Sequence, residues 1–195
     1  MDLLSNNKSS YYKEKFIGLT YTNQKIKNKE FENCIFEKCI FIECTFENCR
    51  FIDTNFFGCS ISANKPYNSK FTNIVFKDSK IMGFDWTKAR SVRLLTFECC
   101  DISYSNFSFL KLSNLKLVGC IAKEVSFNET DLTNGLFTKT DFLNSVFLNT
   151  NLTKADFRKA FNYGIDFNFN ILKKAKFSLP EAASLLKSLD IMLEE

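Results

Sequence analysis

Residues 31–50 read FENCI FEKCI FIECT FENCR, four consecutive pentapeptides that each begin with Phe and carry Cys at the fourth place. The same period of five extends from Phe16 to Phe177, with one extra residue between Trp86 and Phe97. Of the 23 Phe in the chain, 18 lie in this register. A repeat this long and this regular decides the fold.

A period of five fits neither an α-helix nor a straight strand. Five residues advance a helical side chain by about 140° beyond a full turn, and on a strand residues i and i+5 point to opposite faces. The chain must therefore bend once in each pentapeptide. If the large residue at position i and the small residue at i−2 both point inward, positions i+1 and i+2 form the corner. Four corners close a coil, so that residues 20 apart stack in columns.

The stacked columns form the predicted core, because each inner residue packs on its counterparts in the neighbouring coils. About eight coils, spaced like strands at about 4.8 Å, give a rod on the order of 40 Å long. The predicted core residues are Phe31, Phe36, Phe41, Phe46, Phe51, Phe56, Phe76, Phe97, Phe107, Leu112, Phe127, Leu132, Phe137, Phe147, Leu152, Phe157, Phe167, Leu172 and Phe177.

The repeat resembles that of the pentapeptide repeat proteins, in which a small residue, Asp or Asn, and Leu or Phe precede two variable residues. The matching segments include Ser105–Phe109 (SNFSF), Thr130–Asn134 (TDLTN) and Ala155–Lys159 (ADFRK). The resemblance implies an all-β fold, a right-handed quadrilateral β-helix over residues 16–177. An N-terminal segment (1–15) would precede it and a C-terminal capping α-helix (178–195) would follow. The family includes bacterial, stand-alone proteins that protect DNA gyrase from quinolones, to which the likeness is distant.

Three segments depart from the pattern. Near residues 62–70, Pro66 occupies an inward position and cannot donate a hydrogen bond, so a bulge or short loop is expected. Residues 87–96 contain the extra residue and three basic side chains, and near residues 161–169 an Asn takes the inward position. These segments are either loops that bind a partner or bulges that the fold tolerates.

The C-terminal stretch changes to a helical period. Ser178, with Pro180 and Glu181 after it, is typical of a capping box that opens a helix. The apolar stripe that follows would cover the last coil, whose edge could otherwise recruit another chain. Alternatively, the stripe pairs two copies, which the resemblance favours. The first fifteen residues show no comparable cap, so that end is either frayed or covered by a partner.

Eight Cys raise the question of a metal site. Seven of them lie at position i−2, and successive ones point inward from different sides of the coil. A zinc site needs four converging ligands, and the chain contains no His. We therefore interpret these Cys as small buried wall residues, predict no metal, and expect Cys99, at a corner, to be the most exposed.

The sequence indicates no enzyme. It contains neither a Gly-rich phosphate loop nor a G-x-S-x-G motif, and no Ser or Cys can have a His partner. Acidic residues fall mostly at outward positions, and the inward columns offer no place for a catalytic carboxylate pair. We predict no catalytic residue, no cofactor-binding residue and no cofactor.

Charge limits the possible partners. The net charge is +4, and residues 61–120 carry nine basic and four acidic residues without a basic run, which makes direct nucleic-acid binding unlikely. Residues 30–53 carry six acidic and two basic residues. That excess is either a surface that mimics DNA or an ordinary charged wall.

These observations favour a non-catalytic solenoid that presents a rigid surface to a protein partner of unknown identity. The alternative is a DNA mimic that binds a topoisomerase (gyrase) and confers quinolone tolerance. The chain could also form a homo-oligomer through its C-terminal helix or an uncapped coil end. No apolar run is long enough to cross a membrane, so we expect a cytoplasmic protein. The possible partner surface comprises Glu37, Glu43, Glu47, Lys88, Arg90, Arg93, Leu186, Leu189 and Leu193.

Overall fold

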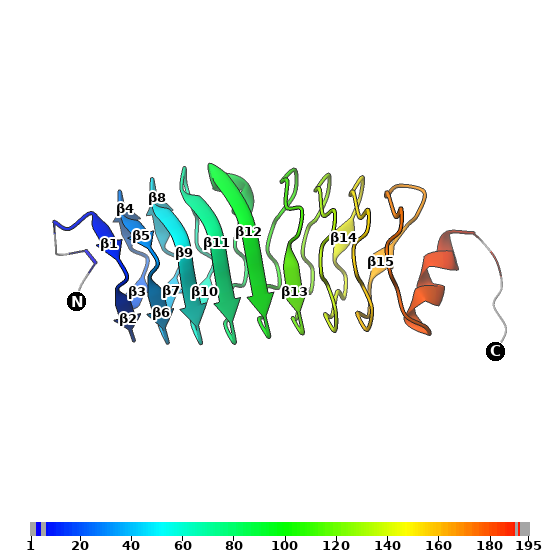
Figure 1. Ribbon diagram of the computed structural model, residues 1–195, viewed down its shortest axis with the longest axis horizontal. Helices are drawn as coiled ribbons and strands as arrows, with labels where there is room; N and C mark the ends of the chain where they lie inside the picture. The colour runs from blue at the N-terminus through cyan, green and yellow to red at the C-terminus, as the bar shows by residue number, and fades with distance from the viewer. Residues whose placement is uncertain (1–2, 5–6, 190, 192–195) are drawn as a thin grey trace.

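The computed structural model describes residues 3–4, 7–189 and 191, and in it short segments stack into a rod (Figure 1). The fold is the predicted β-solenoid, with about eight turns and one helix at its C-terminal end. The strands are β1 (Ser10–Tyr12), β2 (Lys15–Ile17), β3 (Thr20–Thr22), β4 (Lys25–Lys27), β5 (Glu30–Glu32), β6 (Ile35–Glu37), β7 (Ile40–Ile42), β8 (Thr45–Glu47), β9 (Arg50–Phe57), β10 (Ser60–Ser62), β11 (Lys70–Lys77), β12 (Ser91–Glu98), β13 (Lys116–Val118), β14 (Val146–Phe147) and β15 (Gly164–Ile165). Two 3₁₀ helices, η1 (Trp86–Lys88) and η2 (Glu181–Leu189), complete the described elements.

Strand pairing is parallel, and in most of the chain paired residues are 20 apart in sequence. We number the coils 1 to 8, and their residues are 10–29, 30–49, 50–69, 70–90, 91–110, 111–130, 131–150 and 151–170. Each coil has four faces, I to IV, which in coil 2 are centred on Phe31, Phe36, Phe41 and Phe46. Coil 4 holds the extra residue, so that Phe71 pairs with the residue 21 positions later.

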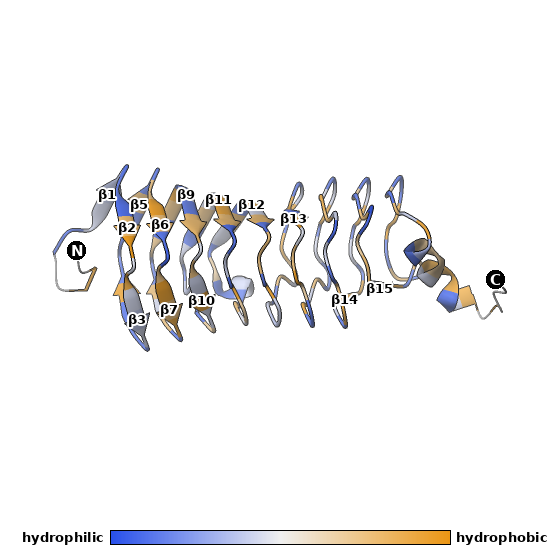
Figure 2. Ribbon diagram, turned by 90° about the horizontal axis from the view of Figure 1, so that it is seen from below, coloured by the Kyte–Doolittle hydropathy of each residue, from blue (hydrophilic) through white to orange (hydrophobic). Residues whose placement is uncertain are grey.

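Aromatic rings stack along the axis inside the rod. On face I, the ring centroid of Phe51 lies 4.9 Å from that of Phe31 and 5.0 Å from that of Phe71, with nearly parallel planes. Most inward residues are buried, and hydrophobic and hydrophilic segments are interspersed along the rod (Figure 2). Burying each such ring contributes about 1.5–3 kcal/mol, and ring stacking adds about 0.5–1.5 kcal/mol. The ladder of rings is therefore the main source of stability.

The residue at i−2 joins consecutive coils through hydrogen bonds. Thr54 Oγ1 donates to the carbonyl of Phe31 at 3.1 Å, and Ser69 Oγ donates to that of Phe46 at 2.9 Å. Ser69 Oγ also accepts the Cys49 N–H at 2.9 Å. Small polar residues therefore occupy this wall because they satisfy the backbone of the coil below as well as fitting beside the rings.

The first coil begins at Ser10, earlier than the expected start at residue 16. Strand β1 pairs with β5, and the buried ring of Tyr11 stacks on Phe31 at 5.1 Å. Leu3 is also buried, and its N–H donates to Tyr21 Oη at 2.7 Å. The open end of coil 1 is therefore covered in part by the chain itself.

Pro66 keeps its inward register, and the expected bulge does not form there. Its carbonyl accepts the Ser69 N–H at 3.1 Å, which closes an ordinary turn. Pro66 has no N–H to give to the carbonyl of Asp85 in the next coil, and that carbonyl accepts the Lys88 N–H at 3.3 Å instead. The extra residue of coil 4 is absorbed in η1 at this point.

The prediction that Phe167 belongs to the core is wrong, because this side chain is 37% exposed. Ile165 pairs with Phe147 and takes the inward position, and Tyr163 is buried nearby. The cause is Asn162, which adopts the positive φ (58°) of a corner residue and so moves the corner earlier in the coil.

The C-terminal helix differs from the expected α-helix. It is the 3₁₀ helix η2, and the capping box does not form because coil 8 recruits both of its side chains. Ser178 Oγ accepts the Lys159 N–H at 2.8 Å, and Glu181 Oε1 accepts the Asn162 N–H at 2.6 Å. The two residues thus bond to the coil edge rather than to the helix. Among the described residues, no helix is both long and apolar enough to cross a membrane.

Candidate functional site

The interior of the solenoid raises the pKa of six of its seven buried thiols. Seven Cys are buried and Cys99 is exposed. Burial raises the pKa of Cys49 and of Cys100 to about 11 and that of Cys120 to about 12. A hydrogen bond with the Cys39 thiol, together with burial, also raises the pKa of Cys59. Because the thiolate is the nucleophile and the metal ligand, these groups are suited to packing.

The core residues predicted up to Phe157 are buried, and the last two, Leu172 and Phe177, are half-buried against the core. Sequence reasoning missed Phe84, which occupies an i−2 position and is buried against Trp86 with ring centroids 4.2 Å apart. Within the described ranges, no three His, Cys, Asp or Glu converge on a point that could hold a metal ion. The residues available for function therefore lie on the outer faces.

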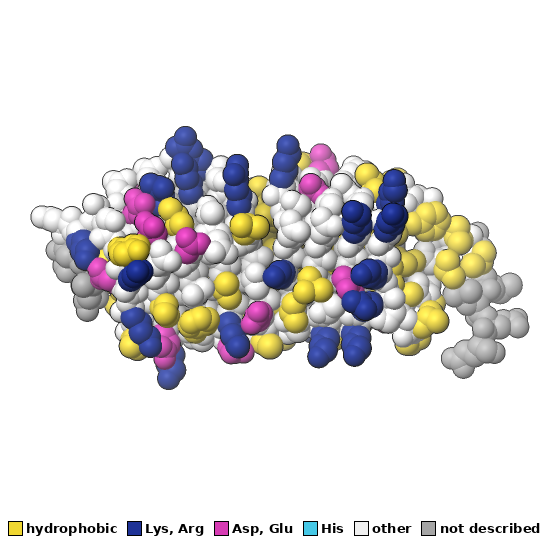
Figure 3. Space-filling view, viewed as in Figure 1, with side chains coloured by type: hydrophobic (Ala, Val, Ile, Leu, Met, Phe, Trp, Pro, Cys, Tyr) yellow, Lys and Arg dark blue, Asp and Glu magenta, His cyan; other side chains and the backbone are white. Residues whose placement is uncertain are grey.

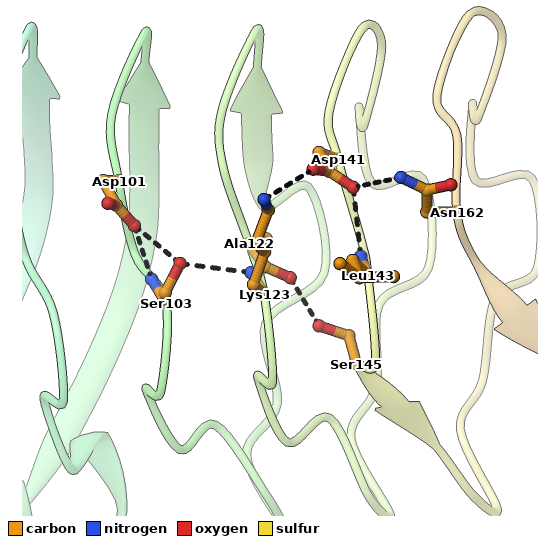
Figure 4. Close-up of polar contacts among 8 residues, drawn as sticks. All are labelled: Asp101, Ser103, Ala122, Lys123, Asp141, Leu143, Ser145 and Asn162. Carbon is orange, nitrogen blue, oxygen red and sulfur yellow. Dashed lines mark hydrogen bonds and ion pairs between the residues drawn. The ribbon is translucent and has the colours of Figure 1, made fainter.

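Polar side chains on face III link coils 5 to 8 (Figure 4). Asp101 accepts hydrogen bonds from the N–H and the hydroxyl of Ser103, and Ser103 Oγ accepts the Lys123 N–H at 3.3 Å. Lys123 Nζ lies 3.5 Å from Asp141, which also accepts a hydrogen bond from Asn162 Nδ2 at 2.8 Å. These carboxylates are used to hold turns and coils together.

The acidic stretch of residues 30–53 is largely neutralised by its neighbours. Lys15 forms an ion pair with Glu37 at 2.5 Å, and Lys27 forms one with Glu47 at 3.1 Å. The Lys15 ammonium lowers the pKa of Glu37. Glu43 lies at an exposed corner with positive φ. Coil 1 carries five Lys and one Glu whereas coil 2 carries five Glu and one Lys, so the +4 of one coil stacks on the −4 of the next.

The basic residues of segment 87–96 lie where coils 4 and 5 meet. Lys88 lies in η1, with its Nζ 4.0 Å from Asp85. The Arg90 N–H bonds to the Ser69 carbonyl, and Arg93 pairs with Thr72 of β11. The fold thus places these cations beside coils that are distant in sequence.

Two more cations lie on the same face, and the sequence analysis did not single them out. Lys70 pairs with Ser91, next to Arg90. Lys111 is the first residue of coil 6 and therefore lies on the far side of Ser91. Aligning every twentieth residue by charge as well as by hydrophobicity would have found both.

Exposed apolar side chains gather at the C-terminal end of the rod. Leu186 and Leu189 of η2 are exposed, and so are Phe161, Phe169 and Ile171 of the last coils. The predicted surface residue Leu193 lies outside the described residues. In the face of the molecule seen in Figure 3, hydrophobic side chains cluster over this end, while basic and acidic side chains are interspersed along the rod. The structure therefore brings Leu186 and Leu189 together but separates them from the charged candidates.

The stacked parallel coils, the five-residue period and the i−2 ladder define a repeat protein of the β-solenoid class. More narrowly, the repeat is of the pentapeptide repeat type. The model "Pentapeptide repeats (8 copies)" matches residues 126–161, and a second model, the SV2A/B/C luminal domain, matches residues 4–76.

The fold is similar to that of a solved structure. A trypsin-treated form of QnrB1, described as a plasmid-mediated fluoroquinolone resistance protein, aligns with a TM-score of 0.65 and 19% identity over 91% of this chain and 100% of that one. HetL, a pentapeptide repeat protein of the cyanobacterium Nostoc, aligns with a TM-score of 0.41 and 12% identity over 87% of this chain and 90% of HetL. No curated protein matches in sequence. At these identities the likeness concerns the fold alone.

Proposed function

We propose that this protein is a non-catalytic scaffold whose outer faces bind a protein partner. The observation that carries the proposal is the difference between the inward side chains, which hold the coils together, and the outward ones, which face solvent. The inward positions are filled by stacked rings and coil-linking hydrogen bonds, whereas many basic and large apolar side chains are exposed on the outer faces. A rigid rod with variable outer positions is the arrangement that repeat proteins use for recognition.

The alternative, a DNA mimic that binds gyrase, has less support. QnrB1 is described as a fluoroquinolone resistance protein, but its identity to this chain is only 19%. A mimic of DNA needs a continuous field of unpaired negative charge. Here Glu30, Glu37 and Glu47 each lie in an ion pair with a basic residue of an adjacent coil.

We also propose a second copy of the chain as a partner at the C-terminal end. The exposed apolar residues of η2 and of the last coils support this contact, because large apolar patches on monomers are uncommon. We expect the double substitution Leu186→Glu and Leu189→Glu to shift any dimer seen by sedimentation equilibrium to monomer. A dimer that survives these changes would contradict a contact through η2.

Site-specific cross-linking in cells tests the main proposal. A photoreactive phenylalanine placed at Tyr67, Thr72, Lys77 or Met82 samples faces IV, I, II and III, since these four residues occupy equivalent i+1 positions. We expect one adduct of constant mass from one face or from two adjacent faces. Adducts from none of the four positions, or the same mixture from all of them, would contradict the proposal.

A separate assay, in which purified protein is added to gyrase supercoiling reactions with a fluoroquinolone, distinguishes the scaffold from the DNA mimic. The proposal predicts neither inhibition nor rescue. Rescue that is lost when Glu37, Glu43 and Glu47 are changed to Lys would favour the DNA mimic.

A further inference from the structure

Four cations on face I of coils 4 to 6 form no ion pair within the described part of the chain. We call them the basic strip: Lys70, Arg90, Arg93 and Lys111. None of the ion pairs formed among the described residues involves a member of the strip. In coils 1 to 3, Lys15, Lys27 and Arg50 each form an ion pair with a glutamate of an adjacent coil.

Within coils 4 to 6 the basic strip meets no acidic residue on its own face, and the nearest one on that face is Asp131 of coil 7, the bridge partner of Lys111. Residues 68–74, 88–95 and 109–115, which form face I and its corners in these coils, include no Asp or Glu. The carboxylates at the margins already have partners within hydrogen-bond distance. Asp53 accepts from Asn73, Asp85 from Thr87 and Asp131 from Thr133. The strip therefore holds its positive potential toward solvent.

A hollow of about 380 Å³ lies at one end of the basic strip. Its lining residues are Thr72, Arg93, Leu94, Lys111, Ser113 and Asn114. Strand β12 runs straight through the corner between faces I and II in coil 5, whereas coil 6 makes a tight turn there, with the Leu115 N–H bonded to the Leu112 carbonyl at 3.0 Å. The hollow thus coincides with the change from one kind of corner to the other.

The lining matches a glutamate side chain. A guanidinium and an ammonium can bind a carboxylate, and the hydroxyls of Thr72 and Ser113 and the amide of Asn114 offer further donors. Leu94, exposed at its corner, supplies an apolar wall for the methylene groups of such a side chain.

We propose that the basic strip and this hollow bind an extended, glutamate-rich segment of a protein partner. One carboxylate occupies the hollow between Arg93 and Lys111, and others contact Lys70 and Arg90. Three coils span about 10 Å, which corresponds to about three or four residues of extended chain. This inference rests on the proposed scaffold function and names the chemistry of its partner.

The dimensions of the strip favour a peptide over nucleic acid. Tight binding to DNA requires many phosphate contacts, and the affinity falls steeply with salt for each one. The strip offers four cations within about 10 Å, fewer contacts than tight binding to DNA requires. The Asp131 carboxylate beside Lys111 opposes further phosphates along this face, whereas a short acidic segment needs to contact the four cations alone.

Fluorescence anisotropy with defined probes tests the inference. The probes are a fluorescein-labelled peptide of about eight residues made mostly of Glu, the matched Gln peptide, and a single-stranded oligonucleotide of equal charge. The test variant is Arg93→Glu with Lys111→Glu. The control, Lys139→Glu with Lys154→Glu, makes the same change of net charge at two exposed corners of coils 7 and 8.

We expect the Glu peptide to bind and the Gln peptide not to bind, with an affinity that falls as added salt shortens the Debye length below about 8 Å. The test variant should weaken binding by about tenfold or more and the control by less than about twofold. Equal losses in the two variants, tighter binding of the oligonucleotide, or no binding of the Glu peptide at low salt would each overturn the inference.

Because melting curves report whether the variants fold, loss of structure is recognised separately. If cross-linking still yields a face-specific adduct while the peptide fails to bind, the scaffold function stands and only the acidic partner is rejected.

Discussion

The two halves of the solenoid share one core but turn their corners differently. Residues 10–99 form strands of three to eight residues, whereas residues 100–177 form mostly isolated bridges and β-turns. In the second half the N–H of residue i+3 bonds back to the carbonyl of the inward residue, as Gly135 does to Leu132 at 2.9 Å and Ala155 to Leu152 at 3.0 Å. In both halves the residue at i+2 has positive φ, as at Asn33 and Asn134.

The residue at i−1 accounts for the difference. In the second half it is often Asp or Asn, whose side chain accepts the N–H two residues later, as Asp131 does from Thr133 at 3.0 Å and Asn151 from Thr153 at 3.1 Å. Such a bond stabilises a turn locally. In the first half the same position holds Ile35, Ile40 or Thr45, which favour extended strands. The inward residue at position i therefore fixes the register, and the residue at i−1 determines whether the corner is an extended strand or a β-turn.

If the stacked rings stabilise both halves, removing one ring should lower the free energy of unfolding equally in either half. Phe51→Ala and Phe127→Ala delete rings that stack on both neighbours within 5.4 Å. We expect each to reduce the free energy of unfolding by about 3–5 kcal/mol in urea denaturation. Phe109→Ala, at an exposed corner, should change it by less than about 0.5 kcal/mol. A mild effect in one half alone would mean that the two cores are not equivalent.

This core could be predicted from the sequence because position i repeats without ambiguity from Phe31 to Phe157. The prediction fails at Phe167, since Asn162 starts a corner early and Ile165 restores the inward position with a different spacing. The early corner at Asn162 and the changed spacing at Ile165 compensate each other. A search for a period of five therefore does not detect either change. The C-terminal helix type was missed for a related reason, because the side chains of Ser178 and Glu181 bind coil 8.

For the candidate partner surface, the sequence could indicate which residues are charged, but not which of them form ion pairs. Glu37 and Glu47 looked like an acidic field until stacking placed Lys15 and Lys27 beside them. Lys70 and Lys111 looked unremarkable because each lies about 20 residues from Arg90 or Arg93. The three-dimensional neighbours of a coil residue are one coil away, and the charge pattern has to be analysed at that spacing.

The wall residues at i−2 include both hydroxyls and thiols, and five of the seven thiols, Cys34, Cys39, Cys44, Cys49 and Cys59, lie in the first half. Thr130 Oγ1 donates to the buried Phe107 carbonyl at 3.0 Å, whereas Cys49 Sγ lies 3.3 Å from that of Ile26. Thr130→Val should cost about 1–3 kcal/mol in unfolding free energy, because a buried acceptor loses its partner. Cys49→Ser should be tolerated within about 1 kcal/mol, as Ser69 occupies the next coil in the same column. A larger loss from the Cys49 change than from the Thr130 change would refute this ranking.

The turn bonds should matter in the second half only. We expect Asp131→Ala to lower the unfolding free energy by about 1 kcal/mol, since the Thr133 N–H loses its acceptor, and Asp131→Asn to retain most of the stability. The equivalent first-half change, Lys70→Ala, should fall within about 0.5 kcal/mol. Similar costs for Asp131→Ala and Lys70→Ala in chemical denaturation would undermine the role given to position i−1.

The smallest expected effect is a pH dependence. Arg158 lies 2.7 Å from Asp156 and lowers the pKa of that carboxyl below its usual 3.8. A carboxyl with a depressed pKa in the folded state adds stability above its unfolded pKa and loses it as pH falls through the folded value. Arg158→Ala should therefore destabilise the protein slightly at neutral pH, and the difference from wild type should vanish in acid. A difference that persists unchanged in acid would show that the Arg158 side chain acts by packing instead.

The central claim is that the junction between the two halves, where the corner type changes, is the surface that meets a partner. Lysine acetylation followed by mass spectrometry, with and without the Glu peptide, tests it most directly. We expect the peptide to protect Lys70 and Lys111 and to leave Lys139 and Lys154 as reactive as before. Equal protection of all four lysines, or protection confined to Lys139 and Lys154, would contradict the account.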